Sequence, residues 1–324
     1  MTAVPGDAVA WGFLGAGWIA RKAMADAVHA AGNARLQGVA SRDRSRSAAL
    51  EPAVVHESYA HLLEDPQIEV VYISLANHQH ALWAIRALEA GKHVLCEKPL
   101  GLHAGQARLM TMAARGANRL LVEAAWVRWH PRFRRLARLV AAGDLGSIVA
   151  IDSAFTFTAD VGDNYRGSPD MGGGALLDVG GYSAHAWAAL TPDAAFAPIS
   201  VEQQLSASGI DLTTRVTGRV GIGTTVNALL SFEQPERQSL TVTGSAGSAR
   251  MLGASAFTSW REPSALLVDG HEEAFPAVDA YRLMVENVGA VVRGEDGWVV
   301  PIKESLRVAQ ALDAIASAGP GHPG

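Results

Sequence analysis

The stretch Val9-Ala10-Trp11-Gly12-Phe13-Leu14-Gly15-Ala16-Gly17-Trp18-Ile19-Ala20 decides the fold of this chain. An apolar run, predicted to be a strand over 9–14, leads through small residues into a helical pattern over 18–31. Gly15 permits a tight turn, Gly17 lets a pyrophosphate approach the backbone, and Ala20 allows close contact between helix and strand. The alternative is an ordinary βα turn, because a glycine match alone is a weak signal. The flanks favour a dinucleotide site, which we expect to use Gly15, Ala16, Gly17, Trp18 and Ile19.

Short apolar runs alternate with helical patterns through the first third of the chain. The expected strands cover residues 9–14, 36–41, 54–57, 70–75, 93–96 and 120–123. Strands that alternate with helices predict a parallel sheet with right-handed crossovers, and nearly unbroken apolar strands predict a sheet covered on both faces. The sequence therefore predicts a doubly wound Rossmann domain of the α/β class over residues 1–124.

The pattern changes after residue 124. We expect helices over 132–142, 173–190, 278–293 and 303–318, and strands over 148–158, 200–207, 213–220, 224–232, 239–243 and 265–268. Alternating residues and short glycine turns favour antiparallel pairing. Residues 125–324 are thus predicted to form an α+β domain with an open, largely antiparallel sheet, whose last helix packs back on the first domain.

Composition excludes several classes of protein. The chain has 324 residues, enough for two domains, with 49% hydrophobic and 18% charged residues. A net charge of −5 gives no general attraction to nucleic acid or to an acidic membrane. One cysteine, Cys96, permits no intrachain disulfide, and neither a membrane-length apolar run nor a signal peptide is evident. We expect a cytoplasmic enzyme without a metal ion.

The end of the second predicted strand bears on the choice of nucleotide. Rossmann domains specific for NAD usually carry an acidic residue there, but this chain has Ser41 and Arg42, with Asp43 falling late. Ser41 can donate a hydrogen bond to a 2′-phosphate, and Arg42 can pair with it. The alternative is that Arg42 is a solvated turn residue. The sequence favours NADP, with NAD possible.

The loop after the strand at 70–75 is expected beside the same crevice. Asn77 can lie near the cofactor, although capping of the following helix is a strong alternative. His80 is predicted to orient or support this loop rather than to react.

The run His93-Val94-Leu95-Cys96-Glu97-Lys98-Pro99 places a lysine directly after a buried strand. A lysine at a strand end is usually a solvated charge, but this one is expected at the carboxyl edge of the nucleotide-binding sheet. Glu97 is predicted to bind a ribose hydroxyl or to hold the lysine. Base rates favour a trans Lys98–Pro99 peptide.

A second constellation lies in the glycine-rich segment 172–185. If this segment is helical, then Asp178, Tyr182 and His185 share one face. Gly180 and Gly181 each cost roughly 1 kcal/mol in a helix relative to alanine. This cost suggests close approach by a nicotinamide ring or a substrate; the alternative is a helix packed tightly on a sheet.

These motifs resemble the glucose-fructose oxidoreductase/inositol dehydrogenase (Gfo/Idh/MocA) family over nearly the full chain. The matching segments are Gly15-x-Gly17-x-x-Ala20, the loop 77–80, the run 91–99 and Gly173-Gly174-Ala175-Leu176-Leu177-Asp178-x-Gly180-x-Tyr182. The resemblance implies a Rossmann domain followed by a mixed α/β domain. In the family the open sheet of that domain commonly mediates oligomerisation, so we expect a homodimer or homotetramer.

The resemblance also implies roles for individual residues. Lys98 matches the family's active-site lysine and Asp178 its substrate-orienting carboxylate. Tyr182 falls where inositol dehydrogenases carry a catalytic histidine. A tyrosine at this position resembles the branch that contains dihydrodiol dehydrogenases, NADP-linked xylose dehydrogenases and glucose-fructose oxidoreductase. Two further departures are His185, where aspartate is frequent, and Ala76, where proline is frequent.

The expected chemistry is transfer of hydride between nicotinamide C4 and a carbon that bears a hydroxyl or a carbonyl. Tyr182 would carry the proton, although His185 remains an alternative. A free tyrosine has a pKa of about 10, which a neighbouring Lys98 cation would lower. Lys98 would also stabilise the developing alkoxide, while Asp178 binds a substrate hydroxyl or holds the lysine.

The sequence leaves the substrate open. Trp126 and Arg128 are candidate contacts, although core packing is the alternative for the tryptophan, and Tyr165 and Arg166 are weaker candidates. The favoured function is a dehydrogenase or reductase acting on a small-molecule sugar, polyol or dihydrodiol. The alternatives are a non-catalytic NAD(P)-binding sensor, and an enzyme whose tightly held NAD assists glycoside cleavage or internal transhydrogenation.

Overall fold

The chain folds as two units in the computed structural model, which describes residues 8–162, 164–253 and 255–319. The first unit comprises the described residues up to Gly101, together with 105–126 and 279–302. The second comprises 102–104, 127–278 and the described residues from Lys303 onward. The outermost residues of the two expected domains, 1–7 and 320–324, lie outside the described part.

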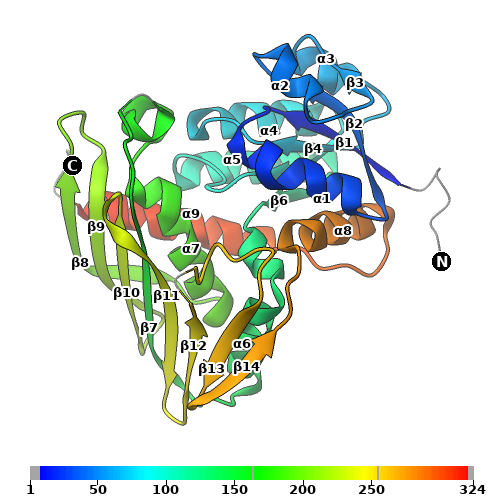
Figure 1. Ribbon diagram of the computed structural model, residues 1–324. Helices are drawn as coiled ribbons and strands as arrows, with labels where there is room; N and C mark the ends of the chain where they lie inside the picture. Colours follow the sequence, from blue (N-terminus) through cyan, green and yellow to red (C-terminus); the bar gives the residue numbers. More distant parts are fainter. Residues whose placement is uncertain (1–7, 163, 254, 320–324) are drawn as a thin grey trace. The chain divides into compact units, whose positions relative to one another are not determined.

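The first unit is built on a six-stranded parallel sheet (Figure 1). Its strands are β1 (Val9–Leu14), β2 (Ala34–Ala40), β3 (Val54–Val55), β4 (Val70–Ile73), β5 (His93–Cys96) and β6 (Leu121–Glu123). They lie in the order β3-β2-β1-β4-β5-β6, with every pair parallel. This order is that of the Rossmann fold, whose ligands bind outside the carboxyl ends of the strands, where the order reverses. The expected fold of this part is confirmed.

Helices of the first unit come from two distant parts of the sequence. They are a π-helical turn (Ala20–Met24), α1 (Ala25–Ala30), α2 (Arg44–Ala48), α3 (Tyr59–Glu64), α4 (His80–Glu89), α5 (Ala104–Ala117) and α8 (Ala280–Arg293). The last of these packs on α1, β1 and β2. Asn33 donates its side-chain amide to the Glu286 carbonyl across 2.8 Å, and Arg293 pairs with Glu69. A late helix therefore completes the nucleotide-binding unit.

The second unit contains an eight-stranded sheet in the order β14-β13-β12-β11-β7-β10-β9-β8 (Figure 1). The strands are β7 (Ile148–Thr158), β8 (Phe196–Leu205), β9 (Asp211–Val220), β10 (Thr224–Ser231), β11 (Glu233–Gly244), β12 (Ser248–Leu252), β13 (Ser264–Val268) and β14 (His271–Phe275). All neighbours are antiparallel except β7 and β10, which run parallel. The sheet is therefore mixed but largely antiparallel, as expected.

Two strands of this sheet have no counterpart in the sequence-based prediction. The strand β12 reads Ser-Ala-Arg-Met-Leu, and β14 reads His-Glu-Glu-Ala-Phe. Charged residues lower β propensity, and β14 lies at the edge of the sheet, where solvent can hydrate them. Pairing with β11 and β13 therefore outweighs the weak local signal.

Helices α6 (Pro131–Ala142), α7 (Ala175–Leu190) and α9 (Ile302–Ala318) belong to this unit. The helix α7 packs on β7, β9 and β10. A Cβ built on Gly180 would lie 3.0 Å from the Leu230 side chain and 3.3 Å from that of Leu312. Gly180 therefore serves tight packing of α7 against β10 and α9, and the expectation of a ligand approaching this glycine is wrong. No helix of the described residues is long and apolar enough to cross a membrane.

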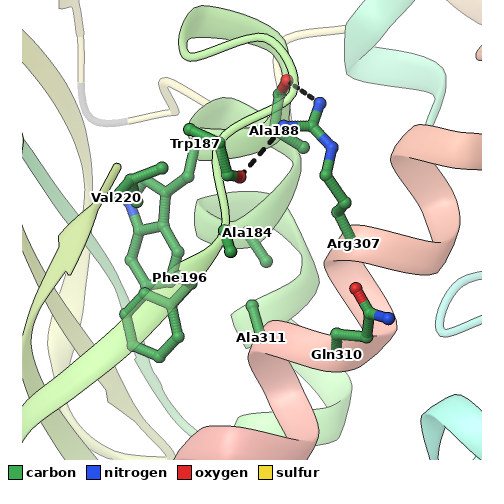
Figure 2. Close-up of a pocket in the computed structure, with 10 residues that line it drawn as sticks. Ala184, Trp187, Ala188, Phe196, Val220, Arg307, Gln310 and Ala311 are labelled. Atoms are coloured by element: carbon green, nitrogen blue, oxygen red, sulfur yellow. Dashed lines mark hydrogen bonds between the residues drawn. The ribbon is translucent and has the colours of Figure 1, made fainter. Parts of the chain in front are cut away.

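Arg307 of α9 binds backbone carbonyls at the end of α7 and in the segment that follows it (Figure 2). Its guanidinium donates to the carbonyls of Ala188 and Ala194 across 2.7 and 3.1 Å. It also donates to the Thr191 carbonyl across 2.9 Å. Beside it, the Trp187 indole stacks on the Phe196 ring of β8, with centroids 5.1 Å apart. These side chains line a pocket of about 50 Å³, room for only a few water molecules. The pocket is a packing feature of this unit.

Candidate active site

The turn after β1 has the geometry that the glycine motif predicts. Gly15 adopts φ +98°, and a Cβ there would lie 2.7 Å from the Ser74 carbonyl oxygen. A Cβ on Gly17 would meet only that same oxygen, at 3.6 Å. The turn is therefore closed on the side of β4 and open beyond Gly17, which fits a pyrophosphate. Ala16 and Ala20 are buried, Ile19 is half-buried and Trp18 is 62% exposed.

Asp43, the first carboxylate after β2, has a structural role. Asp43 caps α2 by accepting from the backbone N–H groups of Ser45 and Arg46, and it also accepts from the Ser45 hydroxyl. The Ser45 hydroxyl and these N–H bonds hold the pKa of Asp43 below its ordinary value. Ser41 donates its hydroxyl to the Asp43 carbonyl across 2.6 Å. Arg42 is exposed and forms no ion pair within the described residues. The site thus offers an exposed cation, and a hydroxyl that must turn away from the Asp43 carbonyl before it can donate to a phosphate.

Asn77 and His80 stand at the carboxyl end of β4. Asn77 is buried in a short 3₁₀ turn (Asn77–Gln79) that leads directly into α4. The two ring nitrogens of the buried His80 lie 2.8 Å from the Pro99 carbonyl and 3.0 Å from that of Leu75. Burial lowers the pKa of His80. This histidine thus links the loops that follow β4 and β5, which agrees with the orienting role predicted for it.

Lys98 follows β5 directly, in a segment held by buried polar groups. Beside the His80 contact to Pro99, the Glu123 carboxylate accepts from the Leu100 N–H across 3.1 Å. Lys98 itself is half-buried. Its peptide bond to Pro99 is cis, so the expectation of a trans bond is wrong; the proline amide makes the cis form accessible. The backbone directly after the lysine is therefore anchored at two successive residues.

Glu97 is buried beside this lysine and accepts a hydrogen bond of 2.7 Å from the Tyr72 hydroxyl. Burial raises the pKa of Glu97, although the Tyr72 bond and the Lys98 charge act in the opposite direction. One carboxylate oxygen of Glu97 is therefore bound to a side chain of β4. The role of Glu97 toward a ribose or the lysine stays a prediction.

The glycine-rich segment is helical from Ala175, and α7 carries Asp178, Tyr182 and His185. Asp178 is buried and accepts from the Arg166 Nε across 2.8 Å. Tyr182 is half-buried, and its ring lies 5.1 Å from that of Phe155 and 5.5 Å from that of Phe257. His185 lies deeper, with 1% of its surface exposed. Tyr182 therefore has a fixed ring at a half-open position.

Arg166 is the residue whose importance the sequence understates. It stands in a 3₁₀ turn (Tyr165–Gly167), with its guanidinium carbon 5.1 Å from the centre of the Tyr165 ring. Burial alone would lower the pKa of Arg166, but attraction to Asp178, Tyr165 and Tyr182 raises it. The only sequence signal was a Tyr-Arg pair before the glycines. The structure adds a cation within electrostatic range of Tyr182.

The two remaining candidates are packed internally. Trp126 is buried and stacks on Tyr281 at the start of α8, with ring centroids 5.4 Å apart. Arg128 is buried and donates to Glu304 across 2.8 Å. Both packing partners, Tyr281 and Glu304, lie late in the sequence. Trp126 and Arg128 therefore have structural roles, and their roles in substrate binding stay predictions. Among the described residues no cluster of His, Cys, Asp and Glu could hold a metal ion.

Family models match both parts of the chain. Residues 9–124 match the oxidoreductase family with the NAD-binding Rossmann fold. Residues 133–250 match the GFO/IDH/MocA C-terminal domain.

Individual relatives cover most of this sequence. The chain is 34% identical to a D-xylose 1-dehydrogenase (NADP(+)) of Haloferax volcanii, over 94% of this chain and 95% of the relative. It is 31% identical to a trans-1,2-dihydrobenzene-1,2-diol dehydrogenase of Bos taurus, over 74% of this chain and 70% of the relative. Among solved structures, KijD10, a 3-ketoreductase from Actinomadura kijaniata in complex with NADP and TDP-benzene, aligns with a TM-score of 0.87 and 26% identity. That alignment covers 96% of this chain and 98% of the other.

Proposed function

This chain belongs to the GFO/IDH/MocA family and is an NAD(P)-dependent oxidoreductase, and we propose that it transfers hydride between NADP and a sugar, polyol or dihydrodiol. The observation that carries the proposal is the position of Lys98. It follows β5 at the sheet edge that also holds the Gly15 turn, in a loop anchored by His80 and Glu123. A cation so fixed can stabilise an alkoxide as charge develops.

NADP is the proposed cofactor because of the residues that follow β2. Asp43, the first carboxylate after β2, caps α2, whereas Ser41 and the exposed Arg42 can bind a 2′-phosphate. The open side of Gly17 admits the pyrophosphate, at the N-terminal end of a helical segment. The xylose dehydrogenase relative and the ketoreductase structure are both linked to NADP by name.

We assign the chemical roles as follows. The nicotinamide, when bound, supplies or accepts the hydride. Tyr182 takes the proton from the substrate hydroxyl, or returns it to the carbonyl oxygen in the reverse direction. Arg166 is a cation that favours the phenolate form of Tyr182, and Asp178 holds Arg166 and receives a substrate hydroxyl. Lys98 stabilises the alkoxide as its charge develops.

A screen of the purified protein tests this proposal. NADP⁺ and NAD⁺ are each offered with a panel of aldoses, inositols and dihydrodiols, and reduction is followed at the nicotinamide absorbance. We expect turnover with at least one of these substrates and a preference for NADP⁺. Tight binding of the nucleotide without any turnover would instead favour a sensor. A nucleotide that copurifies and is not exchanged would favour glycoside processing or internal transhydrogenation.

The assembly and location belong to the same proposal. We propose a homodimer or homotetramer formed through the eight-stranded sheet, whose strands carry large exposed apolar residues at Val149, Ile199 and Leu205. Light scattering after size exclusion tests the assembly. Cys96 is a buried free thiol, which suits the reducing cytoplasm.

A further inference from the structure

The helix that carries Asp178 and Tyr182 begins without a cap of its own. Its N-cap residue is Gly174, at φ 101° and ψ 155°, and no local side chain accepts from the first turn. Two more glycines, Gly172 and Gly173, precede it. An uncapped first turn leaves backbone N–H groups without acceptors inside the protein. The acceptor has to come from elsewhere in the fold.

That acceptor is Asp211, the first residue of β9. Its Oδ2 accepts from the Leu176 N–H across 2.8 Å and from the Thr214 hydroxyl across 2.6 Å. Asp211 is only 9% exposed. A carboxylate from a neighbouring strand thus does for α7 what an N-cap side chain does for an ordinary helix.

Gly174 is required for this arrangement. A Cβ at that position would lie 2.0 Å from Oδ1 of Asp211, and its φ is one that other residues rarely adopt. The glycine run before α7 therefore admits a carboxylate of the protein itself. The space beside Gly174 is therefore filled by the Asp211 side chain and not by a ligand.

We propose that Asp211 is a positioning residue: by capping α7 from β9 it fixes the first turn, and hence the placement of Asp178 and Tyr182, for the reaction. The inference rests on the proposed function, since it assigns Tyr182 and Asp178 to that chemistry. The side chain of Asp211 binds Leu176 and Thr214 and does not itself take part in the chemistry. It acts through the helix, because the Leu176 N–H that it binds lies two residues before Asp178 and six residues before Tyr182.

The same contacts join the cap to the loop that holds Arg166. Gly174 donates its N–H to the Arg166 carbonyl across 2.9 Å, while Arg166 donates from Nε to Asp178. The charged groups around the cap are therefore Arg166 and Asp178, and no ion pair of Asp211 is present in the described part of the chain. Loss of the cap would loosen both the helix start and this loop.

The test compares Asp211→Ala with Asp211→Asn in the full-length protein. The alanine removes the acceptor, whereas the amide oxygen of asparagine can still accept from Leu176 and Thr214. For D211A we expect kcat to fall about 10- to 100-fold while the Kd for NADPH stays unchanged. For D211N we expect kcat to stay within about threefold of wild type. Asp152→Ala, an exposed aspartate on β7, is the matched control and should leave kcat unchanged.

Hydrogen exchange of the amides in 175–179 supplies a readout independent of turnover. These amides should exchange several-fold faster in D211A and at the wild-type rate in D211N. If wild type shows no turnover with any substrate, the proposed function fails, and exchange alone decides whether Asp211 caps the helix.

Three results would overturn the inference. They are an unchanged kcat in a folded D211A, amide exchange in D211N as fast as in D211A, and a D211A protein that loses affinity for NADPH while its kcat is unchanged. Should D211A fail to fold, Thr214→Val decides the matter, because it removes one donor to the same carboxylate oxygen. Faster exchange and a lower kcat in T214V would support the cap, and wild-type behaviour in both would refute it.

Discussion

Arg166 donates from Nε to Oδ2 of Asp178 across 2.8 Å, and this bond joins the loop before α7 to the first turn of that helix. This pair balances the negative charge of the buried Asp178 carboxylate and fixes the orientation of the Arg166 guanidinium. Because Arg166 also interacts electrostatically with Tyr182, it supplies a positive charge to the residue that we propose as the proton carrier.

Replacing Arg166 should therefore change the pH dependence of the reaction. In Arg166→Gln the phenolate of Tyr182 loses a stabilising charge, so its pKa rises and the basic form is reached at higher pH. We expect kcat/KM near neutral pH to fall roughly 10- to 100-fold, and the rising limb of its pH profile to move up by about one unit. Arg166→Lys should be intermediate. Arg135→Gln removes a comparable surface pair with Glu273 and is the control. An unshifted limb in R166Q would contradict this role.

Lys98 should affect chemistry rather than nucleotide binding. In Lys98→Met we expect kcat to fall by at least about 10²-fold, because an alkoxide loses its stabilising cation, while the Kd for NADPH changes little. Stopped-flow turnover and fluorescence titration measure the two quantities. Lys303→Met, which removes an exposed lysine paired with Asp193, should behave like wild type. Wild-type turnover in K98M would refute the assignment.

Arg42 should set the preference between the two nucleotides. In Arg42→Ala we expect the Kd for NADP⁺ to rise about 10- to 100-fold, the usual worth of a charge-assisted hydrogen bond to a phosphate. The Kd for NAD⁺ should not change, because that nucleotide lacks the 2′-phosphate. Arg44→Ala tests an exposed arginine two residues on. Equal losses for both nucleotides would mean that Arg42 only stacks on the adenine.

Asp211 gives stability an unusual pH dependence. Burial raises the pKa of Asp211 to about 6, from an ordinary value of 3.8, despite its bonds from Thr214 and Leu176. The folded state thus binds this proton more tightly than the unfolded chain, so the contribution of Asp211 is most favourable below pH 3.8 and is lost as the pH rises through 6.

Asp211→Asn should remove this dependence. The free energy of unfolding of each protein is measured in urea. We expect the value for D211N, relative to that of wild type, to increase by about 1–3 kcal/mol between pH 4 and pH 8. A difference that stays flat over this range would show that the folded state does not shift the proton affinity of Asp211.

Arg307 should matter for stability alone. In Arg307→Met three carbonyl oxygens that follow or end α7 lose their donor, and we expect unfolding to require about 2–4 kcal/mol less free energy. Arg282→Met removes only an exposed pair with Glu286 and should cost about 0.5 kcal/mol. A cost for R307M no larger than that of R282M would contradict the structural role.

Local patterns account for the parts that were predicted correctly. The alternation of apolar strands and helices is a property of neighbouring residues, and parallel strands place their carboxyl ends on one edge. The positions of the Gly15 turn and of Lys98 followed from these two facts. The helix that carries Asp178 and Tyr182 could be predicted because a spacing of four residues already defines one helical face.

Contacts between distant segments account for the parts that were missed. The charged strand β14 forms because β13 offers it a partner, and Trp126 is covered by Tyr281, which lies far along the chain. The Gly180 position is explained by Leu230 and Leu312, and no local pattern in the sequence points to them.

By itself, the sequence determined the nucleotide-binding fold and the family, because these depend on periodicity and short motifs. Only the tertiary structure decided what surrounds those residues. Asp211 caps a helix 35 positions earlier in the sequence, and Arg166 pairs with a carboxylate 12 positions later. Such pairs form because strand order and loop closure bring them together, and no spacing along the chain encodes that distance.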